Sequence, residues 1–431
     1  MSDDNAYIKW FRNSAPYINA HRGKTFVLMI SGEAVAHPNF PTIIHDIALL
    51  NSLGVNLVLV HGARPQIEAR VQQRSIDSRF HGELRITDPG TLDCVCDAAG
   101  SLRAHIEALL SMGVANSPMH GAAIRVASGN YVTARPIGVV DGVDLEHTGQ
   151  VRRIDAEAIH RQLAQDNMVL ISPLGYSPTG EIFNLALEDI VVEAAAAIKA
   201  DKLIIFDELP GIMCDGQLLR ECELRDARAL LPSASNAASL QTIIRAGERG
   251  ISRCHLIGYS EDGALLEELY TRDGAGTLVS SDHYEELVSA NIDDVGGIIE
   301  IIAPLEEEGV LVKRSRELLE NEIHCFKVIR RDGVVIACAA LYPYPDNGCG
   351  EIACVATHPD YRRSDRGERL LLALEKHARS MGLQSVFVLT TRTAHWFQEQ
   401  GFTPASVEQL PPGKQQLYNF QRNSKVFNKV L

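Results

Sequence analysis

The sequence predicts two α/β units, a larger domain with a mostly parallel sheet sandwiched by helices and a smaller α+β domain after it. A chain of 431 residues exceeds what one hydrophobic core usually organises. From about residue 25 to 280, short runs of valine, isoleucine and leucine alternate with helical patterns, which favours parallel strands joined by crossover helices. Beyond residue 280 this alternation stops and a different pattern begins.

The first domain opens with a helical pattern over residues 5–20 that packs either on its own domain or against a neighbouring subunit. Helices are then expected at 40–53, from Pro65, and at 187–200. The expected strands are TFVLMI, VNLVLVHG, NMVLISPLG, DKLIIFDE and RCHLIG. Residues 120–155 alternate like antiparallel hairpins inserted as a flap, and their Ser-Gly-Asn turn supports this. Ligands of such a sheet bind at the carboxyl ends of its strands.

The second domain begins near Asn291 with the helical pattern IDDVGGIIEIIAPLEEEG. Two strands around a turn follow, HCFKVIRRDG and VVIACAALYPYP, and then the strand GEIACVATHPDYR. A long helix runs to Gly382, before the strand SVFVLTT, the short helix HWFQEQ and the run LYNFQR. We therefore expect a helical arm at 1–20, a first domain at 21–282 and a second at 290–431.

Composition and charge limit the possible partners. No apolar run approaches the roughly 18 residues that span a membrane, and the first residues do not resemble a secretory signal, so a cytoplasmic location is expected. A net charge of −14 gives no overall attraction to nucleic acid or to a membrane surface. The nine cysteines contain no CxxC pair, so we expect reduced thiols and no bound metal. Small-molecule substrates are the expectation.

The loop after GEIACVATHPDYR carries chemistry of its own. It leads into a helix that begins near Asp365 or Arg366, and a helix N-terminus with nearby arginines binds phosphate. Gly367 permits a close backbone approach. The alternative is a surface loop with solvated arginines.

Order and sequence together resemble the GNAT family of acetyl-CoA-dependent N-acetyltransferases, whose Arg/Gln-x-x-Gly-x-Gly/Ala turn cradles the coenzyme A pyrophosphate. Here Asp365 replaces the first motif glycine, and its carboxylate is expected to cap the helix. The runs ACVATHPDYRRSDRGERLL, LTTRTAHWFQEQGF, QLYNFQRNSKVF, LVHGARPQI and IDAEAIHRQL resemble the bacterial N-acetylglutamate synthases over essentially the whole chain. These amino-acid acetyltransferases combine an amino-acid kinase-like domain with a GNAT domain.

The resemblance implies a reaction and its ligands. Acetyl is transferred from acetyl-CoA, a co-substrate rather than a permanently bound cofactor, to the α-amino group of L-glutamate. This is the first step of arginine biosynthesis, with L-arginine as a feedback inhibitor. By resemblance, the residues that bind acetyl-CoA are Cys354, Val355, Ala356, Arg362, Arg363, Ser364, Asp365, Arg366, Gly367 and Glu368.

The resemblance places the general base at Glu351, at the start of a strand where a partly buried carboxylate suits proton transfer. An exposed strand-end carboxylate is the alternative. Phe397 occupies the position of the tyrosine that protonates the leaving thiolate in many GNAT enzymes. Thr390, acting through a water, is therefore the predicted acid, with Thr391 and His395 as further candidates. Cys354 could serve as a nucleophile, but no histidine is evidently paired with it, and a buried thiol is the other interpretation.

Recognition of two carboxylates calls for planar guanidinium groups. The predicted substrate-binding residues are Arg314, Arg316, Arg392, Arg422 and Ser424, of which the resemblance favours Arg314 and the Arg422/Ser424 pair. For each arginine the alternative is a solvated surface charge.

The first domain resembles the amino-acid kinase fold without its phosphate chemistry. Its turn Ser31-Gly32 follows Met29, where kinases of this family carry a lysine, and residues 233–253 lack the second lysine. Ala63 and Arg64 replace two glycines of the next turn, and Glu188 aligns best with the kinase aspartate. Loss of both lysines predicts a domain without kinase activity.

Resemblance to arginine-sensitive acetylglutamate kinases predicts an arginine effector site at Lys202, His255, Glu268 and Gly276, closed by the N-terminal helix, and a homo-hexamer. A salt bridge on a helix face is the alternative for Glu268. Two other functions stay open. One is a bifunctional synthase and kinase, and the other is a regulatory arginine-binding protein with a decayed acetyltransferase domain, which Asp365 and Phe397 suggest.

Overall fold

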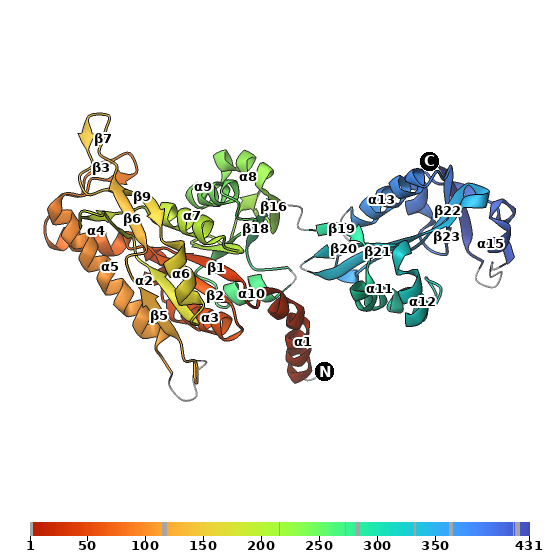
Figure 1. Cartoon of the computed structure of the whole chain (residues 1–431), viewed down its shortest axis with the longest axis horizontal. Coiled ribbons are helices and arrows are strands. Elements are labelled where there is room, and N and C mark those ends of the chain that lie inside the picture. The colour runs from red at the N-terminus through yellow and green to blue at the C-terminus, as the bar shows by residue number, and fades with distance from the viewer. Residues whose placement is uncertain are drawn as a thin grey trace. The chain divides into compact units, whose positions relative to one another are not determined.

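The computed structural model describes residues 3–113, 119–214, 216–271, 273–281, 285–331, 333–361, 365–416, 418 and 423–431. The chain divides into two compact units, Met1–His283 and Tyr284–Leu431. Figure 1 shows the first from red to green and the second from teal to blue. No helix in the described part of the chain combines the length and apolar character that a membrane crossing requires.

The first unit is built on an eight-stranded sheet with the order β16-β18-β17-β13-β1-β2-β10-β5. All neighbours pair in parallel except β17 and β18, which confirms the mostly parallel sheet. The strands are β1 (Thr25–Ile30), β2 (Asn56–His61), β5 (Arg125–Ser128), β10 (Asn167–Ile171), β13 (Lys202–Asp207), β16 (Glu221–Glu223), β17 (Arg253–Gly258) and β18 (Thr277–Ser280).

Side chains of β1 alternate between two cores, as the period of a strand requires. Phe26, Leu28 and Ile30 pack into the core formed with α3 (Phe40–Ser52), α4 (Arg64–Gln73) and α5 (Pro89–Leu110). Val27 and Met29 face the opposite core, formed with α6 (Ala156–Leu163), α7 (Leu187–Ile198) and α9 (Ala237–Glu248). The helices therefore sandwich the sheet, as predicted.

The inserted segment differs from its prediction. The strand β5 is a parallel edge strand beside β10, whereas β6 (Val132–Pro136) lies antiparallel to β9 (Gly149–Ile154) in a separate sheet with β11 (Leu174–Tyr176) and β12 (Ile182–Asn184). The Ser-Gly-Asn turn thus connects two sheets, and the predicted hairpin across it was wrong. In a partly buried edge strand, apolar and polar residues alternate in the same way whether the neighbouring strand runs parallel or antiparallel. The sequence pattern therefore could not distinguish a parallel edge strand from a hairpin.

The remaining helices and strands complete the first unit. The helix α1 (Asp3–His21) contacts α10 (Ala264–Tyr270) where Ser14 Oγ donates to the Tyr270 carbonyl over 3.2 Å and His21 Nε2 to the Leu269 carbonyl over 2.9 Å. The other elements are α2 (Gly32–Ala36), α8 (Leu224–Leu230), η1 (Leu231–Ser233), β3 (Phe80–His81), β4 (Leu84–Arg85), β7 (Val139–Val140), β8 (Val143–Asp144), β14 (Met213–Cys214) and β15 (Gln217–Leu218).

The second unit contains a seven-stranded sheet with the order β19-β20-β21-β22-β23-β25-β24. Its strands are β19 (Glu285–Ser289), β20 (Phe326–Arg331), β21 (Val334–Tyr344), β22 (Cys349–Thr357), β23 (Ser385–Thr390), β24 (Thr403–Ala405) and β25 (Lys425–Val430). Neighbours are antiparallel except β22 and β23. The predicted strand pair β20–β21 is present, and β19, which precedes residue 290, belongs to this sheet.

Two helices supply the main cover of this second sheet. The helix α11 (Val295–Glu307) buries Val295, Ile298 and Ile302 in one apolar cluster, and α13 (Arg366–Ser380) buries Leu370 and Leu374 in another. The remaining helices and turns are α12 (Arg316–Glu322), α14 (Ala394–Glu399), α15 (Pro412–Gln416), η2 (Ile292–Asp294), η3 (Ile323–Cys325), η4 (Pro345–Asn347), η5 (Pro359–Tyr361) and η6 (Val407–Gln409).

Candidate active site

The strands β22 and β23 of the second unit stop pairing part-way along β22. Their parallel register covers Cys349 to Glu351 of β22, although this strand continues to Thr357. On its other side, the register of β22 with β21 shifts opposite Cys338 and Ala340, and Cys354 has a φ of 52°. A left-handed residue in a bulge breaks the ladder locally and redirects the backbone. The stretch from Ile352 to Thr357 therefore has one edge that β23 does not cover.

Glu351 is the last residue of β22 that pairs with β23, and its carboxylate is held by an ion pair. Lys414 Nζ, from α15, lies 2.6 Å from Glu351 Oε2. The Glu351 side chain is 9% exposed and that of Lys414 is 24% exposed, so the pair is shielded from most of the solvent. The predicted base is thus a partly buried carboxylate rather than an exposed strand end.

Arg314 lies in the same electrostatic neighbourhood as Glu351. Burial lowers the pKa of this guanidinium, but Cys354, Tyr342 and Glu351 outweigh that effect and raise it overall. Tyr342 of β21 lies opposite Glu351 of β22 in the sheet register. Its hydroxyl donates to Glu322 Oε2 over 2.8 Å. Arg314 Nη1 itself donates to the Val312 carbonyl over 3.1 Å, so Glu351 acts on this guanidinium through its charge.

The thiol of Cys354 is deeply buried. Burial raises its pKa to about 11, an effect that nearby carboxylates reinforce and Arg314 opposes. Because the thiolate is the nucleophilic form of cysteine, a thiol that stays protonated at neutral pH suits packing better than attack on a thioester. This favours the buried-thiol interpretation.

The start of α13 differs in detail from its prediction. Asp365 occupies the N-cap position, but its side chain makes no capping hydrogen bond, so the predicted carboxylate cap was wrong. The main chain at Asp365, with a φ of −71° and a ψ of 7°, does not have the extended conformation from which a side chain usually caps a helix. Glu368 lies in the first turn of α13.

Arg366 and Gly367 have clear structural neighbours. Arg366 Nε donates to Glu285 Oε1 over 2.7 Å, and Arg369 Nη1 donates to Glu285 Oε2 over 2.9 Å. A Cβ atom on Gly367 would lie 3.2 Å from the Trp396 ring. Arg366 thus ties β19 to α13, and Gly367 allows the Trp396 indole to pack closely. Arg362, Arg363 and Ser364 lie outside the described residues.

Thr390 and Ser424 approach one another at the end of β23. Thr390 pairs with Lys425, the residue after Ser424, in the register of β23 and β25. Thr390 is buried, and its Oγ1 accepts from the Thr393 backbone N–H over 3.0 Å. Phe397, by contrast, is a core residue that contacts the rings of Trp396 and Phe402.

Two predicted substrate-binding arginines instead form surface ion pairs. Arg316 lies 2.8 Å from Glu320 and is 71% exposed, and Arg392 lies 2.8 Å from Glu308 and is 60% exposed. These contacts favour the solvated alternative for both side chains. Arg422 lies outside the described residues.

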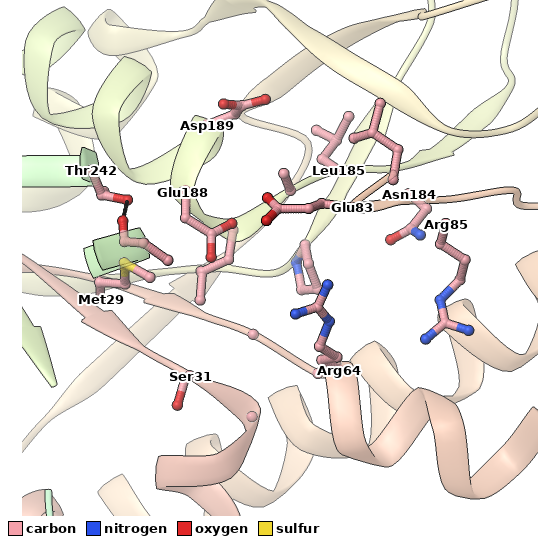
Figure 2. Close-up of a pocket in the computed structure, with 18 of the residues that line it drawn as sticks. Met29, Ser31, Arg64, Glu83, Arg85, Asn184, Leu185, Glu188, Asp189 and Thr242 are labelled. Carbon is pink, nitrogen blue, oxygen red and sulfur yellow. Dashed lines mark hydrogen bonds between the residues drawn. The ribbon is translucent and has the colours of Figure 1, made fainter. Parts of the chain in front are cut away.

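The first unit has a pocket of about 550 Å³ at the carboxyl ends of β1 and β2. Figure 2 shows Met29, Ser31, Arg64 and Glu188 around this cavity. The residues compared above with the phosphate site of the kinases therefore share one cavity. Its described lining contains no lysine, and its acidic groups include Glu33, Glu83 and Asp189.

The four predicted effector residues form one buried network elsewhere in the first unit. Lys202 Nζ lies 3.3 Å from His255 Nε2, and His255 Nδ1 lies 2.6 Å from Glu268 Oε1. Glu268 Oε2 accepts from the backbone N–H of Gly276 over 2.8 Å and from that of Ala275 over 2.9 Å. Because an ammonium only donates, Nε2 of His255 accepts from Lys202 and Nδ1–H donates to Glu268.

The electrostatics of this network agree with a neutral histidine between two charges. Burial lowers the pKa of His255, and Lys202 lowers it further against the opposing effect of Glu268. Burial would raise the pKa of Glu268, but its bonds to His255 and to the two backbone N–H groups lower it overall. A Cβ atom at Gly276 would lie 2.1 Å from the Leu256 carbonyl oxygen, so this position requires glycine.

Family models and curated relatives identify the two units. Residues 24–258 match the model of the amino acid kinase family, and residues 297–402 match that of the GNAT acetyltransferase family. The chain is 56% identical over 429 residues to the amino-acid acetyltransferase of Ectopseudomonas mendocina, and 57% identical over 430 residues to that of Azotobacter vinelandii, covering 99% of each chain. The chain belongs to the amino-acid acetyltransferase family.

Solved structures support this assignment over the full length. A crystal structure of N-acetylglutamate synthase from Neisseria gonorrhoeae with coenzyme A and L-arginine has a TM-score of 0.88 and 35% identity, covering 99% of both chains. The structure of that enzyme with coenzyme A and N-acetyl-glutamate has a TM-score of 0.62 at the same identity and coverage. These comparisons confirm the predicted family resemblance, the fold class and an acetyltransferase activity.

Sequence reasoning missed three residues of this amino-acid acetyltransferase that the structure places beside predicted ones. Lys414 is the partner of Glu351, Tyr342 lies beside Arg314, and Glu285 holds Arg366. Each contact joins residues far apart in the chain, and no local motif marks Lys414 in the run LPPGKQQLY. Among the residues that the structure describes, no group of three or more His, Cys, Asp or Glu side chains could hold a metal ion.

Proposed function

We propose that this acetyltransferase transfers the acetyl group of acetyl-CoA to the α-amino group of L-glutamate, and that L-arginine inhibits it. The observation that carries the catalytic part is the position of Glu351. This shielded carboxylate lies where β22 leaves β23, with Lys414 at 2.6 Å and Arg314 in its electrostatic neighbourhood. This position places a base near two cations that can attract an anionic acceptor. The related synthase that was crystallised with coenzyme A and N-acetyl-glutamate supports this choice of ligands.

In the proposed reaction, Glu351 removes a proton from the ammonium of glutamate, directly or through a water, and the free amine attacks the thioester carbonyl. Backbone N–H groups in the bulged segment from Cys354 to Ala356 then stabilise the oxyanion. Collapse of the tetrahedral intermediate breaks the C–S bond, and Thr390, through a water, relays the second proton released by the nitrogen to the leaving thiolate of coenzyme A. Arg314 binds one acceptor carboxylate, and Arg422 and Ser424 bind the other.

Acetyl-CoA is a co-substrate in this proposal, and its pyrophosphate binds at the loop and first turn that lead into α13. Arg362, Arg363, Ser364, Asp365, Gly367 and Glu368 keep that proposed role. For Arg366 the role is indirect, since its guanidinium is bonded to Glu285 and positions the start of the helix.

The proposed inhibitor site is the network of Lys202, His255, Glu268 and Gly276. Its support is one buried network in which His255 and the Gly276 backbone bond to the Glu268 carboxylate and Lys202 bonds to His255, beside the contact between α10 and α1. The related synthase crystallised with coenzyme A and L-arginine supports this choice of effector. The kinase-like domain is proposed to be inactive in phosphoryl transfer, because the described lining of its pocket offers no lysine.

We further propose that the enzyme opens arginine biosynthesis in the cytoplasm, as a hexamer in which α1 contributes contacts between subunits. Size-exclusion chromatography with light scattering tests the assembly, and truncation before residue 22 tests the role of α1.

The first experiment is release of coenzyme A thiol from acetyl-CoA with glutamate, aspartate, glutamine or ornithine as acceptor, with and without millimolar arginine. Glutamate-selective release that arginine suppresses supports both parts of the proposal. Release that ignores arginine leaves the catalytic part and removes the effector. If no acceptor gives release, the protein is regulatory rather than catalytic.

A further inference from the structure

The lysine that holds Glu351 is itself firmly anchored. Within α15, the Lys414 backbone N–H donates to the Pro411 carbonyl over 2.8 Å. Gln415 Nε2 donates to the carbonyls of Glu408 over 2.9 Å and of Leu410 over 2.7 Å, and Leu410 is buried in an apolar cluster. The backbone of Lys414 is therefore fixed, while its flexible side chain reaches Glu351.

Arg314 is a second cation in the neighbourhood of the same carboxylate, whose charge helps to raise the pKa of its guanidinium. It comes from the segment before α12, far from α15 in the sequence, and its Nη1 donates to the Val312 carbonyl over 3.1 Å. Two other acids of this region have partners of their own, since Glu322 accepts from Tyr342 and Glu306 Oε1 accepts from the Arg314 backbone N–H. Glu351 is therefore the carboxylate that bonds directly to Lys414.

The proposed reaction requires the ion pair between Lys414 and Glu351 to break. The ammonium of the acceptor must reach Glu351 to lose its proton, so it competes with Lys414 for the same carboxylate. A largely shielded ammonium that loses its counter-ion is costly. The exchange becomes favourable when the acceptor brings an anionic group that replaces Glu351 as the partner of Lys414.

We propose that Lys414 transfers from Glu351 to a carboxylate of the acceptor as the amine binds. The two acceptor carboxylates keep the proposed contacts with Arg314 and with Arg422 and Ser424, and Lys414 adds a charge-assisted bond to one of them. Lys414 thereby selects acceptors with two carboxylates. This inference rests on the proposed glutamate acetylation.

The test compares wild type with Lys414→Met, using radiolabelled acetyl-CoA so that slow turnover stays measurable. The acceptors are glutamate, glutamine, which lacks the side-chain carboxylate, and 4-aminobutyrate, which lacks the α-carboxylate. Lys414→Met should lower kcat/KM for glutamate roughly 10- to 100-fold, mainly through KM, as loss of a charge-assisted hydrogen bond predicts. For the analogue without the carboxylate that Lys414 binds, the same variant should change kcat/KM less than about threefold.

Two further variants control for charge and folding. Lys414→Arg keeps a cation and should restore most of the preference for glutamate. Lys376→Met removes an exposed lysine from α13 of the same domain and should leave all three acceptors unchanged. The KM for acetyl-CoA should stay at its wild-type value in Lys414→Met. If that variant does not fold, Lys414→Gln provides the same comparison.

An equal loss of kcat/KM with all three acceptors would overturn the inference, because Lys414 would then act only by holding Glu351. A wild-type enzyme without preference for glutamate would instead overturn the proposed function, and this inference with it.

Discussion

Glu351 combines shielding from solvent, a lysine partner and a position where two strands part, so its role can be tested without disturbing the core. Replacement of Glu351 by glutamine keeps the shape of the side chain and removes its ability to take a proton. We expect kcat to fall by about 10²- to 10⁴-fold, the usual contribution of a general base, with the KM for acetyl-CoA within about threefold of wild type. Steady-state kinetics with both substrates measure this. Glu300→Gln, at an exposed position of α11, is the matched control. A Glu351→Gln variant with wild-type kcat would exclude Glu351 as the general base.

Glu268 offers a similar test in the first domain. Glutamine at this position can still accept from the backbone N–H groups of Ala275 and Gly276, but it cannot carry the charge expected to attract a guanidinium. Glu268→Gln should therefore weaken arginine inhibition by at least about tenfold while kcat without arginine changes little, as follows from losing a charge-assisted bond. Arginine titrations of the acetyl-transfer rate measure the shift. Unchanged inhibition would place the effector site elsewhere.

His61 makes the stability of the first domain sensitive to acid. It is fully buried, its Nδ1–H donates to the Gly62 carbonyl, and Nε2 lies 2.9 Å from Ser172 Oγ. Burial lowers its pKa to about 4 from 6.5, with Arg103 lowering it further and the Gly62 bond opposing the shift. The unfolded chain therefore binds a proton more readily between these values, and stability is lost as the pH falls from about 6.5 towards 4.

The expected loss is about 3 kcal/mol, from 1.36 kcal/mol for each pKa unit. Urea unfolding of wild type and His61→Asn between pH 4 and 7 measures it, and the variant should show a flatter dependence on pH. The pKa of His255 is also lowered, so part of the slope should persist. His160→Asn, at an exposed position of α6, should retain the wild-type slope; parallel curves for wild type and His61→Asn would contradict the prediction.

At the scale of elements, β19 is attached to α13 through a single buried carboxylate. Glu285 is 9% exposed and accepts from both Arg366 and Arg369. Replacing it by alanine leaves two partly buried guanidinium groups without their carboxylate, which should destabilise the second domain by about 3 kcal/mol. Urea unfolding followed by circular dichroism checks this. Glu286→Ala, the neighbouring exposed residue of β19, should change stability by less than about 0.5 kcal/mol.

Local patterns predicted elements better than their partners. Strand periodicity predicted the β20–β21 pair. The break at Pro359 predicted where the strand before α13 ends and hence where this helix begins. Whether β5 joins β6 or β10, and whether the Asp365 carboxylate caps its helix, depends on tertiary geometry that no short window contains. The same reason hides Lys414, whose importance comes entirely from a partner in β22.

At the scale of the whole molecule, each unit has its own buried apolar clusters, formed by residues 26–279 in the first and 290–427 in the second. A fragment that begins at Ser281 retains β19 and Glu285. It should fold cooperatively and transfer acetyl to glutamate at a rate that arginine does not change. Circular dichroism and the thiol-release assay measure both properties. An unfolded fragment, or one that arginine still inhibits, would contradict this prediction.

The overall architecture followed from sequence because the family resemblance extends over the whole chain, and the predicted site residues rest on that same resemblance. That resemblance also predicted one site from four residues that hydrophobic periodicity alone could not connect, namely Lys202, His255, Glu268 and Gly276. It could not show that Arg316 and Arg392 are engaged in surface ion pairs, because a pattern of residues does not record how exposed a side chain is.

The alternating packing of β1 has a consequence for the history of such a chain. Met29 contributes its side chain to one core while the neighbouring residues Leu28 and Ile30 fill the other. A lysine there would have to bring its charge to the pocket edge, whereas a thioether fills the same space without needing a counter-ion. If the domain does not transfer phosphate, as proposed, packing favours an apolar residue at this position, and a lysine there would require compensating changes around it.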